Sequence, residues 1–298
     1  MTTISSVAPA QESGLKAFAK RHPLTAYFAL AYALTWVLIV PIVLSQMGLG
    51  IINLPEPLLF VFLLLSTYSG PLPAALIMTT LIDGREGRRQ LVRRMLQWRL
   101  GLGWYLFLLV AYPLIFLIGL TFYTGAAPWV ALFQNLPLLV TYYLPVAVIG
   151  IIFPSLGEEP GWRGFALPRL QQQYGPLMGT LILGVLHGIW HLPAYFIPGA
   201  ILEGPFDVMA FAANTGLLIA MTVIWTWFFN RTGQSVFFAM FVHGVSNATS
   251  GLIPQIIAEP TGDPWASFKM GAAFALLLIL FTRGRLGYRS AGEQDEIR

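Results

Sequence analysis

The chain has 298 residues, of which 56% are hydrophobic and only 10% are charged, so it is not an ordinary soluble domain, which carries about 25% charged residues. It contains no cysteine, which excludes disulfides, thiolate nucleophiles and cysteine–zinc sites. The net charge of +4 comes from clustered arginines without an aromatic-interleaved basic groove, so we expect no nucleic-acid partner. Repeated apolar stretches predict an all-α fold, a polytopic membrane bundle of about eight transmembrane helices with additional interfacial amphipathic helices.

The first third of the chain begins with a polar tail, residues 1–24, which we expect in the cytoplasm. No small-residue cleavage site follows the first apolar stretch, which predicts an uncleaved membrane anchor. We expect spans at residues 25–46 and 58–82, the second kinked at Gly70-Pro71-Leu72-Pro73. Residues 84–99 then alternate arginines with apolar residues at helical spacing, which predicts a basic amphipathic helix on the membrane surface.

The rest of the chain contains six further apolar stretches and one more segment that we expect at the interface, residues 162–174. The six expected spans are residues 104–124, 136–156, 176–196, 208–230, 235–253 and 265–282. With this arrangement every arginine-rich loop falls on one side, so the positive-inside rule predicts a multi-pass membrane protein with both termini cytoplasmic.

Several charged and aromatic residues in the loops and spans are expected to have structural rather than chemical roles. The opposite loops carry acidic residues that we expect to be solvated, and Lys269 is expected to reach the outer interface. The tryptophans Trp225 and Trp227 are expected to be membrane packing or part of an interfacial belt. The acidic residues in question are Glu203, Asp207, Glu259 and Asp263.

Two adjacent carboxylates, Glu158 and Glu159, end a long run in which the previous charged residue is Arg99. A charge at membrane depth costs roughly 2.5–3.5 kcal/mol on insertion scales, so such residues indicate a functional site by default. Arg163 follows within about one helical turn and can balance their charge.

Two later spans contain polar pairs at the same spacing, which places each pair on one helix face. They are His187 with His191, and His243 with Asn247. We expect these groups and the carboxylates to meet in one hydrated cavity. A carboxylate beside water and an imidazole can act as general base, and an imidazole beside an amide can stabilise an oxyanion, a set that suits water attack on an amide. Alternatively, the carboxylate and histidines can bind zinc, although no H-E-x-x-H motif is present.

The order Glu158-Glu159-x-x-x-Arg163, then an aromatic-x-x-x-His slot ending at His191, then His243-x-x-x-Asn247 resembles the CPBP family of intramembrane proteases. This family contains the CAAX prenyl endopeptidases and the bacterial Abi proteins linked to bacteriocin processing and self-immunity. The resemblance is densest over residues 150–251, and its likeness to the bacterial members implies a location in a bacterial inner or plasma membrane. One position departs from it, because His187 occupies a slot that is usually aromatic, either as a packed polar substitute or as an added ligand or proton relay.

The resemblance implies a role for each matching residue. Glu158 would activate the attacking water with help from His191, and Glu159 and Arg163 would position and charge-balance it. His243 and Asn247 would form the oxyanion site.

Metal dependence stays open at this point. A divalent metal such as zinc would draw its ligands from Glu158, His187, His191 and His243.

These implications give a domain organisation and three functional hypotheses. We expect N-terminal helices at residues 25–135, a catalytic core at 136–255, and a last span with a cytoplasmic tail at 256–298.

The leading hypothesis is an intramembrane endopeptidase that acts on a membrane-associated peptide or protein. The alternatives are a non-catalytic bacteriocin self-immunity or scaffold protein that keeps the motifs, and a transporter with a buried proton relay. The transporter is disfavoured because the polar groups cluster in one place and no internal repeat is detectable.

The depth of the first carboxylate raises one geometric question. His191 lies about 15 residues, or about 22 Å, into its expected span, whereas Glu158 lies near the cytoplasmic end of its own. Either Pro154 and Gly157 kink the fourth span, or the fifth span begins earlier than residue 176.

Overall fold

The computed structural model describes residues 14–201, 204–256, 263 and 265–289, and every regular element within them is helical. The elements, in chain order, are α1 (Leu15–Arg21), α2 (Pro23–Leu44), α3 (Glu56–Ser69), α4 (Pro71–Met95), α5 (Leu102–Thr124), α6 (Ala127–Gln134), η1 (Leu139–Tyr143), α7 (Leu144–Ile152), α8 (Ser155–Gly161), η2 (Trp162–Ala166), α9 (Leu167–Tyr174), α10 (Pro176–Trp190), η3 (Leu192–Phe196), α11 (Val208–Arg231), α12 (Val236–Ile256) and α13 (Ala266–Thr282). The all-helical prediction is therefore confirmed.

The number of membrane spans is smaller than expected. By length and composition, six helical segments of the described chain could cross a membrane, with α3 and α4 counted as one. A seventh is reached if α6 and the helix over residues 139–152, which meet at an angle of 79°, form one broken span. The last apolar helix, α13, has only 17 residues. The expectation of eight full spans is corrected to six or seven, because one stretch is bent and another is short.

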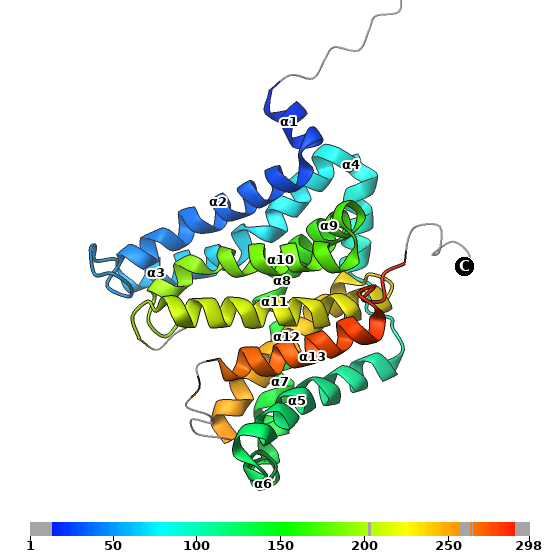
Figure 1. Cartoon of the computed structure of the whole chain (residues 1–298). Coiled ribbons are helices and arrows are strands. Elements are labelled where there is room, and N and C mark those ends of the chain that lie inside the picture. The colour runs from blue at the N-terminus through cyan, green and yellow to red at the C-terminus, as the bar shows by residue number, and fades with distance from the viewer. Residues whose placement is uncertain (1–13, 202–203, 257–262, 264, 290–298) are drawn as a thin grey trace, which may run out of the picture.

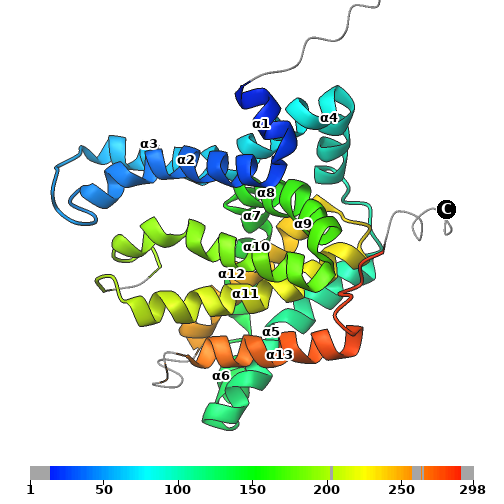
Figure 2. The same cartoon turned by 45° about the horizontal axis from the view of Figure 1, so that its top comes forward.

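Figures 1 and 2 show how the helices are arranged. Helices α2 to α4 lie on one side of the molecule, α5, α6 and α13 lie on the other, and α10 to α12 lie between them. Helix α12 is the central element, since 72% of its apolar stretch is buried against 28–39% in the other candidate spans. The described residues form three hydrophobic clusters: one around α5, α11 and α12, one around α2, α4 and α9, and a smaller one between α2, α3 and Ile197.

The stretch expected as a straight fourth span is interrupted before the carboxylates. Helix α7 ends at Ile152, Phe153 is extended, and α8 begins after Pro154, which cannot donate a backbone hydrogen bond. Helix α7 crosses α12 in direct backbone contact, because a Cβ on Gly150 would lie 2.6 Å from the Cα of Gly244. The interruption lets α8 leave the line of α7 and enter the interior beside α12 and α4.

The segment expected at the interface, residues 162–174, is instead largely core. Trp162 and Phe165 are fully buried, and both rings pack against Tyr27 of α2. The physical reason is that α2 and α4 offer an apolar surface against which the aromatic and leucine side chains of this segment pack. Packing there removes more of their apolar surface from water than a position at the membrane interface would.

The basic amphipathic helix is present as the second half of α4. Gly84 has a positive φ of 69°, which turns the chain before the helix continues to Met95, four residues short of the expected end. Leu91 is buried and Met95 packs beside it, as expected of the apolar face. The other three apolar residues of that face are exposed, and two of them lie beyond the helix end: Val92, Leu96 and Trp98.

Several expected loop charges have defined partners. The carboxylate of Asp207 accepts from the backbone N–H groups of Met209 and Ala210 and caps α11. Lys269 donates to Asp263 at 2.7 Å, and this hydrogen bond, with one from the backbone of Trp265, lowers the pKa of Asp263. The other two acidic residues, Glu203 and Glu259, lie outside the described residues.

Candidate active site

The short helix α8 brings both carboxylates into the protein interior. Glu158 is 4% exposed and Glu159 is fully buried. Close packing makes this placement possible, because a Cβ on Gly157 would lie 2.1 Å from the carbonyl oxygen of Thr67 in α3. Of the two explanations for the depth of Glu158, the break near Pro154 is the one observed, since α10 begins at Pro176 as expected.

Glu159 is the centre of a buried charge-balanced group. Nη1 of Arg163 and Nδ1 of His243 each lie 2.9 Å from the same Glu159 oxygen, Oε1. Because a carboxylate accepts, Nδ1 of His243 is the donor in this contact. Glu159 thus pairs with both groups through Oε1 and orients His243, while its Oε2 is buried without a hydrogen-bond partner among the described residues.

Trp225 of α11 completes this group. Its ring stacks on His243 with centroids 5.0 Å apart and lies 4.8 Å from the guanidinium carbon of Arg163. The expectation that Trp225 is membrane packing is therefore wrong. A tryptophan in an apolar span carries no sequence signal for such a role, because most tryptophans there pack against lipid or other helices.

Glu158 has a separate partner, His187 of α10. His187 is 1% exposed, and its Nε2 lies 2.9 Å from Glu158 Oε2, which also accepts from Nε1 of Trp162 at 3.3 Å. The resemblance implies that His191 assists Glu158, but the direct hydrogen-bond partner is His187. His187, the residue that departs from the family pattern, is therefore the one that contacts Glu158.

His191 lies one turn further along the same helix face. Its Nδ1 lies 3.0 Å from the backbone carbonyl of His187 and donates to it, because a carbonyl only accepts. Its Nε2 then carries no proton when the ring is neutral. Glu158, His187 and His191 each present a ligand-capable atom, and these three atoms lie within 4.8 Å of one another.

A cavity of 280 Å³ adjoins these groups. Its wall includes His187, His191, His243 and Asn247, together with apolar side chains of α5 and α11 such as Phe116. Asn247 is half-buried, one turn beyond His243 on α12. The predicted histidines and Asn247 therefore line one space. Glu158 and Glu159 are not part of its wall, but each makes a hydrogen bond to a histidine that is.

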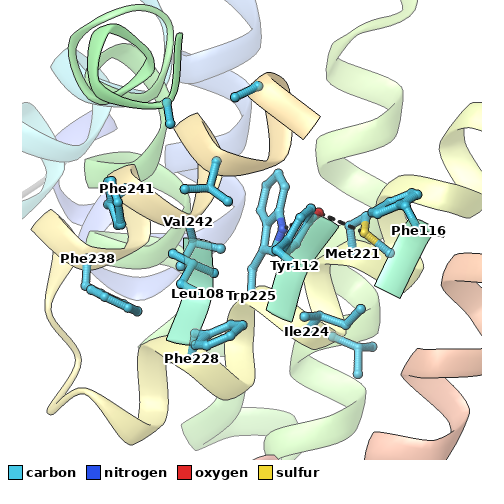
Figure 3. Close-up of a cluster of buried hydrophobic side chains, with 14 of the residues drawn as sticks. Leu108, Tyr112, Phe116, Met221, Ile224, Trp225, Phe228, Phe238, Phe241 and Val242 are labelled. Atoms are coloured by element: carbon cyan, nitrogen blue, oxygen red, sulfur yellow. Dashed lines mark hydrogen bonds between the residues drawn. The ribbon is translucent and has the colours of Figure 1, made fainter. Parts of the chain in front are cut away.

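Figure 3 shows a cluster of buried side chains around Tyr112 and Trp225, whose role the sequence does not indicate. Tyr112 of α5 lies beside Trp225, and its hydroxyl is 3.2 Å from Trp225 Nε1, 3.0 Å from the sulfur of Met221 and 2.7 Å from the hydroxyl of Ser246. This buried network joins α5, α11 and α12 at the level of His243. It holds Trp225 in the orientation in which its ring covers His243.

Comparison with known proteins agrees with the position of the site. Residues 139–249 match the family model described as type II CAAX prenyl endopeptidase Rce1-like. A relative named CAAX prenyl protease 2, from Methanococcus maripaludis, is 26% identical over 115 residues, which cover 38% of this chain and 42% of that protein. The chain thus matches less than half the length of this relative. Residues 139–249, which contain both carboxylates and the histidines of the cavity, are thus similar to the Rce1-like type II CAAX prenyl endopeptidase family.

Proposed function

We propose that this protein is an intramembrane endopeptidase that hydrolyses a peptide bond of a membrane-associated peptide or protein. The observation that carries the proposal is the pairing of two buried carboxylates with different partners beside one cavity. Glu159 is neutralised by Arg163, whereas Glu158 faces only hydrogen-bonding groups and can accept a proton. The two acids therefore have different tasks, as water activation and electrostatic positioning require.

In this proposal Glu158 is the general base. A water in the cavity loses a proton to Glu158 as its oxygen attacks the scissile carbonyl, and His191 accepts a hydrogen bond from the same water through Nε2. His187 orients the Glu158 carboxylate through the 2.9 Å contact with Oε2. The proton held by Glu158 then passes to the leaving amine, so that base and acid functions reside in one group.

His243 and Asn247 form the oxyanion site of the proposal. Nδ1 of His243 donates to Glu159, so His243 can donate through Nε2 only as an imidazolium, which is the form this proposal requires. Two carboxylates, one guanidinium and this imidazolium sum to zero charge, which makes the buried set tolerable. The Asn247 side-chain amide supplies a second donor toward the cavity, and preorganised donors of this kind are a large part of amide hydrolysis catalysis.

The family match and the cavity wall support a proposal for the substrate class. The relative's name points to a CAAX-type substrate, a peptide that ends in a lipid-modified motif, and the apolar wall residues suit a membrane-associated chain. We propose that the substrate enters from the lipid bilayer, which is the other partner of this protein, and that both termini of the enzyme lie in the cytoplasm.

The test is cleavage of a peptide library by the purified protein in liposomes, with farnesylated and unmodified versions of each peptide. We expect wild-type protein to cleave at least one peptide and His243→Ala to lose about 10²–10³-fold in kcat, as loss of an oxyanion donor does. The matched control is Glu56→Gln, an exposed acid at the start of α3. A folded His243→Ala protein with wild-type kcat would contradict the proposal and favour the non-catalytic immunity or scaffold reading.

A further inference from the structure

The basic second half of α4 forms one wall of a pocket that lies outside the candidate active site. The turn between α11 and α12 and the segment after α13 complete the wall, and the volume is about 1090 Å³. The charged side chains that line this arginine pocket are Arg93, Arg94, Arg99, Arg231 and Arg289, with Glu86 as the acid. We propose that the arginine pocket binds the phosphate headgroup of an anionic phospholipid.

The wall of the pocket carries more positive than negative charge. Each guanidinium nitrogen of Arg94 donates to a backbone carbonyl, either of the turn after α11 or of η2, at 2.9–3.4 Å. In the described part of the chain, no carboxylate forms an ion pair with Arg94. Glu86 lies 3.9 Å from Arg89, which is not part of the wall. Cations that are paired mainly with neutral groups favour a ligand that brings negative charge.

Arginine is well suited to a phosphate ligand. A planar guanidinium can donate two parallel hydrogen bonds to phosphate oxygens, and it stays charged at any physiological pH. Arg93, Arg99 and Arg231 are exposed and come from three places in the chain: α4, the connection to α5, and the end of α11. They can therefore surround one anion, which the side chains of a single helix face cannot do.

The position of the pocket favours a lipid over a soluble phosphate. Helices α4 and α11 end beside it, and α5 and α12 begin there, so it lies at one end of the bundle, where spans meet the membrane surface (Figures 1 and 2). Basic pockets between transmembrane helices are typical binding places of anionic headgroups.

The apolar part of the wall favours a lipid as well. Leu96 and Trp98 line the same pocket, and they are 68% and 57% exposed. Tryptophan is enriched at the level of lipid headgroups, and the guanidinium carbon of Arg99 lies 5.3 Å from the Trp98 ring. In the proposed complex the phosphate lies among the arginines, and the acyl chains lie along Leu96 and Trp98.

The arginine pocket and the cavity beside the histidines have no lining residue in common. Arg94 is the link between the two places, because its Nη2 donates to the carbonyl oxygen of Arg163, whose side chain pairs with Glu159. A change of Arg94 would therefore disturb both places, and the test leaves it unchanged.

The double variant Arg93→Gln/Arg231→Gln removes one charge from each of two elements of the wall. Both side chains are exposed, and glutamine keeps part of their length, so we expect the fold to be retained. The matched control is Arg85→Gln/Arg88→Gln, which removes the same charge from exposed residues of α4 that do not line the pocket.

The experiment measures lipid binding to the delipidated full-length protein in detergent by native mass spectrometry. Cardiolipin, phosphatidylglycerol and phosphatidylcholine are titrated separately, and the cardiolipin titration is repeated with excess pyrophosphate. We expect about one cardiolipin per chain, bound at least about tenfold more tightly than phosphatidylcholine, in wild-type protein and in the control. Arg93→Gln/Arg231→Gln should bind cardiolipin about 30-fold more weakly, because each basic residue near an anionic headgroup contributes about fivefold. Pyrophosphate should displace none of the lipid.

Three results would overturn the inference. Equal affinity of the wild-type protein for cardiolipin and phosphatidylcholine would exclude an anion site, and equal losses in both double variants would show general surface attraction. Displacement by pyrophosphate would show that the ligand is a soluble phosphate. If Arg93→Gln/Arg231→Gln has a lower unfolding temperature than wild type without lipid, Arg99→Gln/Arg231→Gln replaces it and must show the same loss. The measurement involves no cleavage, so its outcome is independent of the proposed function.

Discussion

At the scale of single residues, the site is organised by which partner each buried charge has. Glu159 shares one oxygen between Arg163 and His243, while Glu158 contacts His187. A buried charge must be paired and hydrogen-bonded to be tolerated, so these partners decide which acid can take part in chemistry. The motif spacing predicts the acids, the arginine and the histidines, but not which carboxylate pairs with which histidine, because that depends on how α8, α10 and α12 meet.

Trp225 gives the first prediction at this scale. Trp225→Leu removes the ring that covers Arg163 and His243 and also the hydrogen bond to Tyr112. Cation–π contacts in desolvated settings are worth about 2 kcal/mol, so we expect kcat to fall by about tenfold or more with a smaller change in KM. Steady-state cleavage kinetics measure both constants.

The control for this change lies two residues along the same helix. Trp227 packs on Trp104 and Phe107, away from the carboxylates. Trp227→Leu is expected to keep kcat within about twofold of wild type, because packing there does not orient a catalytic group. Equal losses in both variants would show that Trp225 acts through general packing only.

At the scale of elements, the interruptions in the helices determine where the site forms. Helix α7 ends before Pro154, so α8 can turn inward, and the following aromatic segment packs on α2 rather than on the membrane surface. Periodicity predicts the helices well, but it cannot indicate that Trp162 and Phe165 have a partner surface on α2, which is distant in the sequence. The break at Gly84 likewise depends on tertiary packing, so the pattern of basic residues over 84–99 does not predict it.

The crossing of α7 and α12 gives a prediction at this scale. Gly150→Ala places a methyl group 2.6 Å from the Cα of Gly244, so the two helices must separate. Overpacking of this kind costs about 1–3 kcal/mol, and we expect a lower unfolding temperature in detergent and reduced cleavage, because His243 lies on the displaced helix. Gly103→Ala in α5 is the control, since no atom lies within 4 Å of its added Cβ. An unchanged unfolding temperature in Gly150→Ala would contradict this crossing.

At the scale of the whole molecule, one central helix connects the proposed catalytic groups with the two larger hydrophobic clusters. Helix α12 carries His243 and Asn247 and is far more buried than the other candidate spans. The sequence predicts the eight apolar stretches correctly as helices, but not their ability to span, because bending and length depend on packing against neighbours. The placement of the termini in the cytoplasm stays a prediction from the positive-inside rule.

The central proposal for this protein is that Glu158 activates water for peptide hydrolysis. The most direct measurement is the single-turnover cleavage rate of Glu158→Gln in liposomes, with wild-type protein and Glu56→Gln measured alongside. Glutamine keeps the size and the hydrogen bonds of the side chain but cannot take up a proton, so we expect a rate about 10²–10⁴-fold below wild type with an unchanged unfolding temperature. A folded Glu158→Gln protein that cleaves at the wild-type rate would contradict the claim.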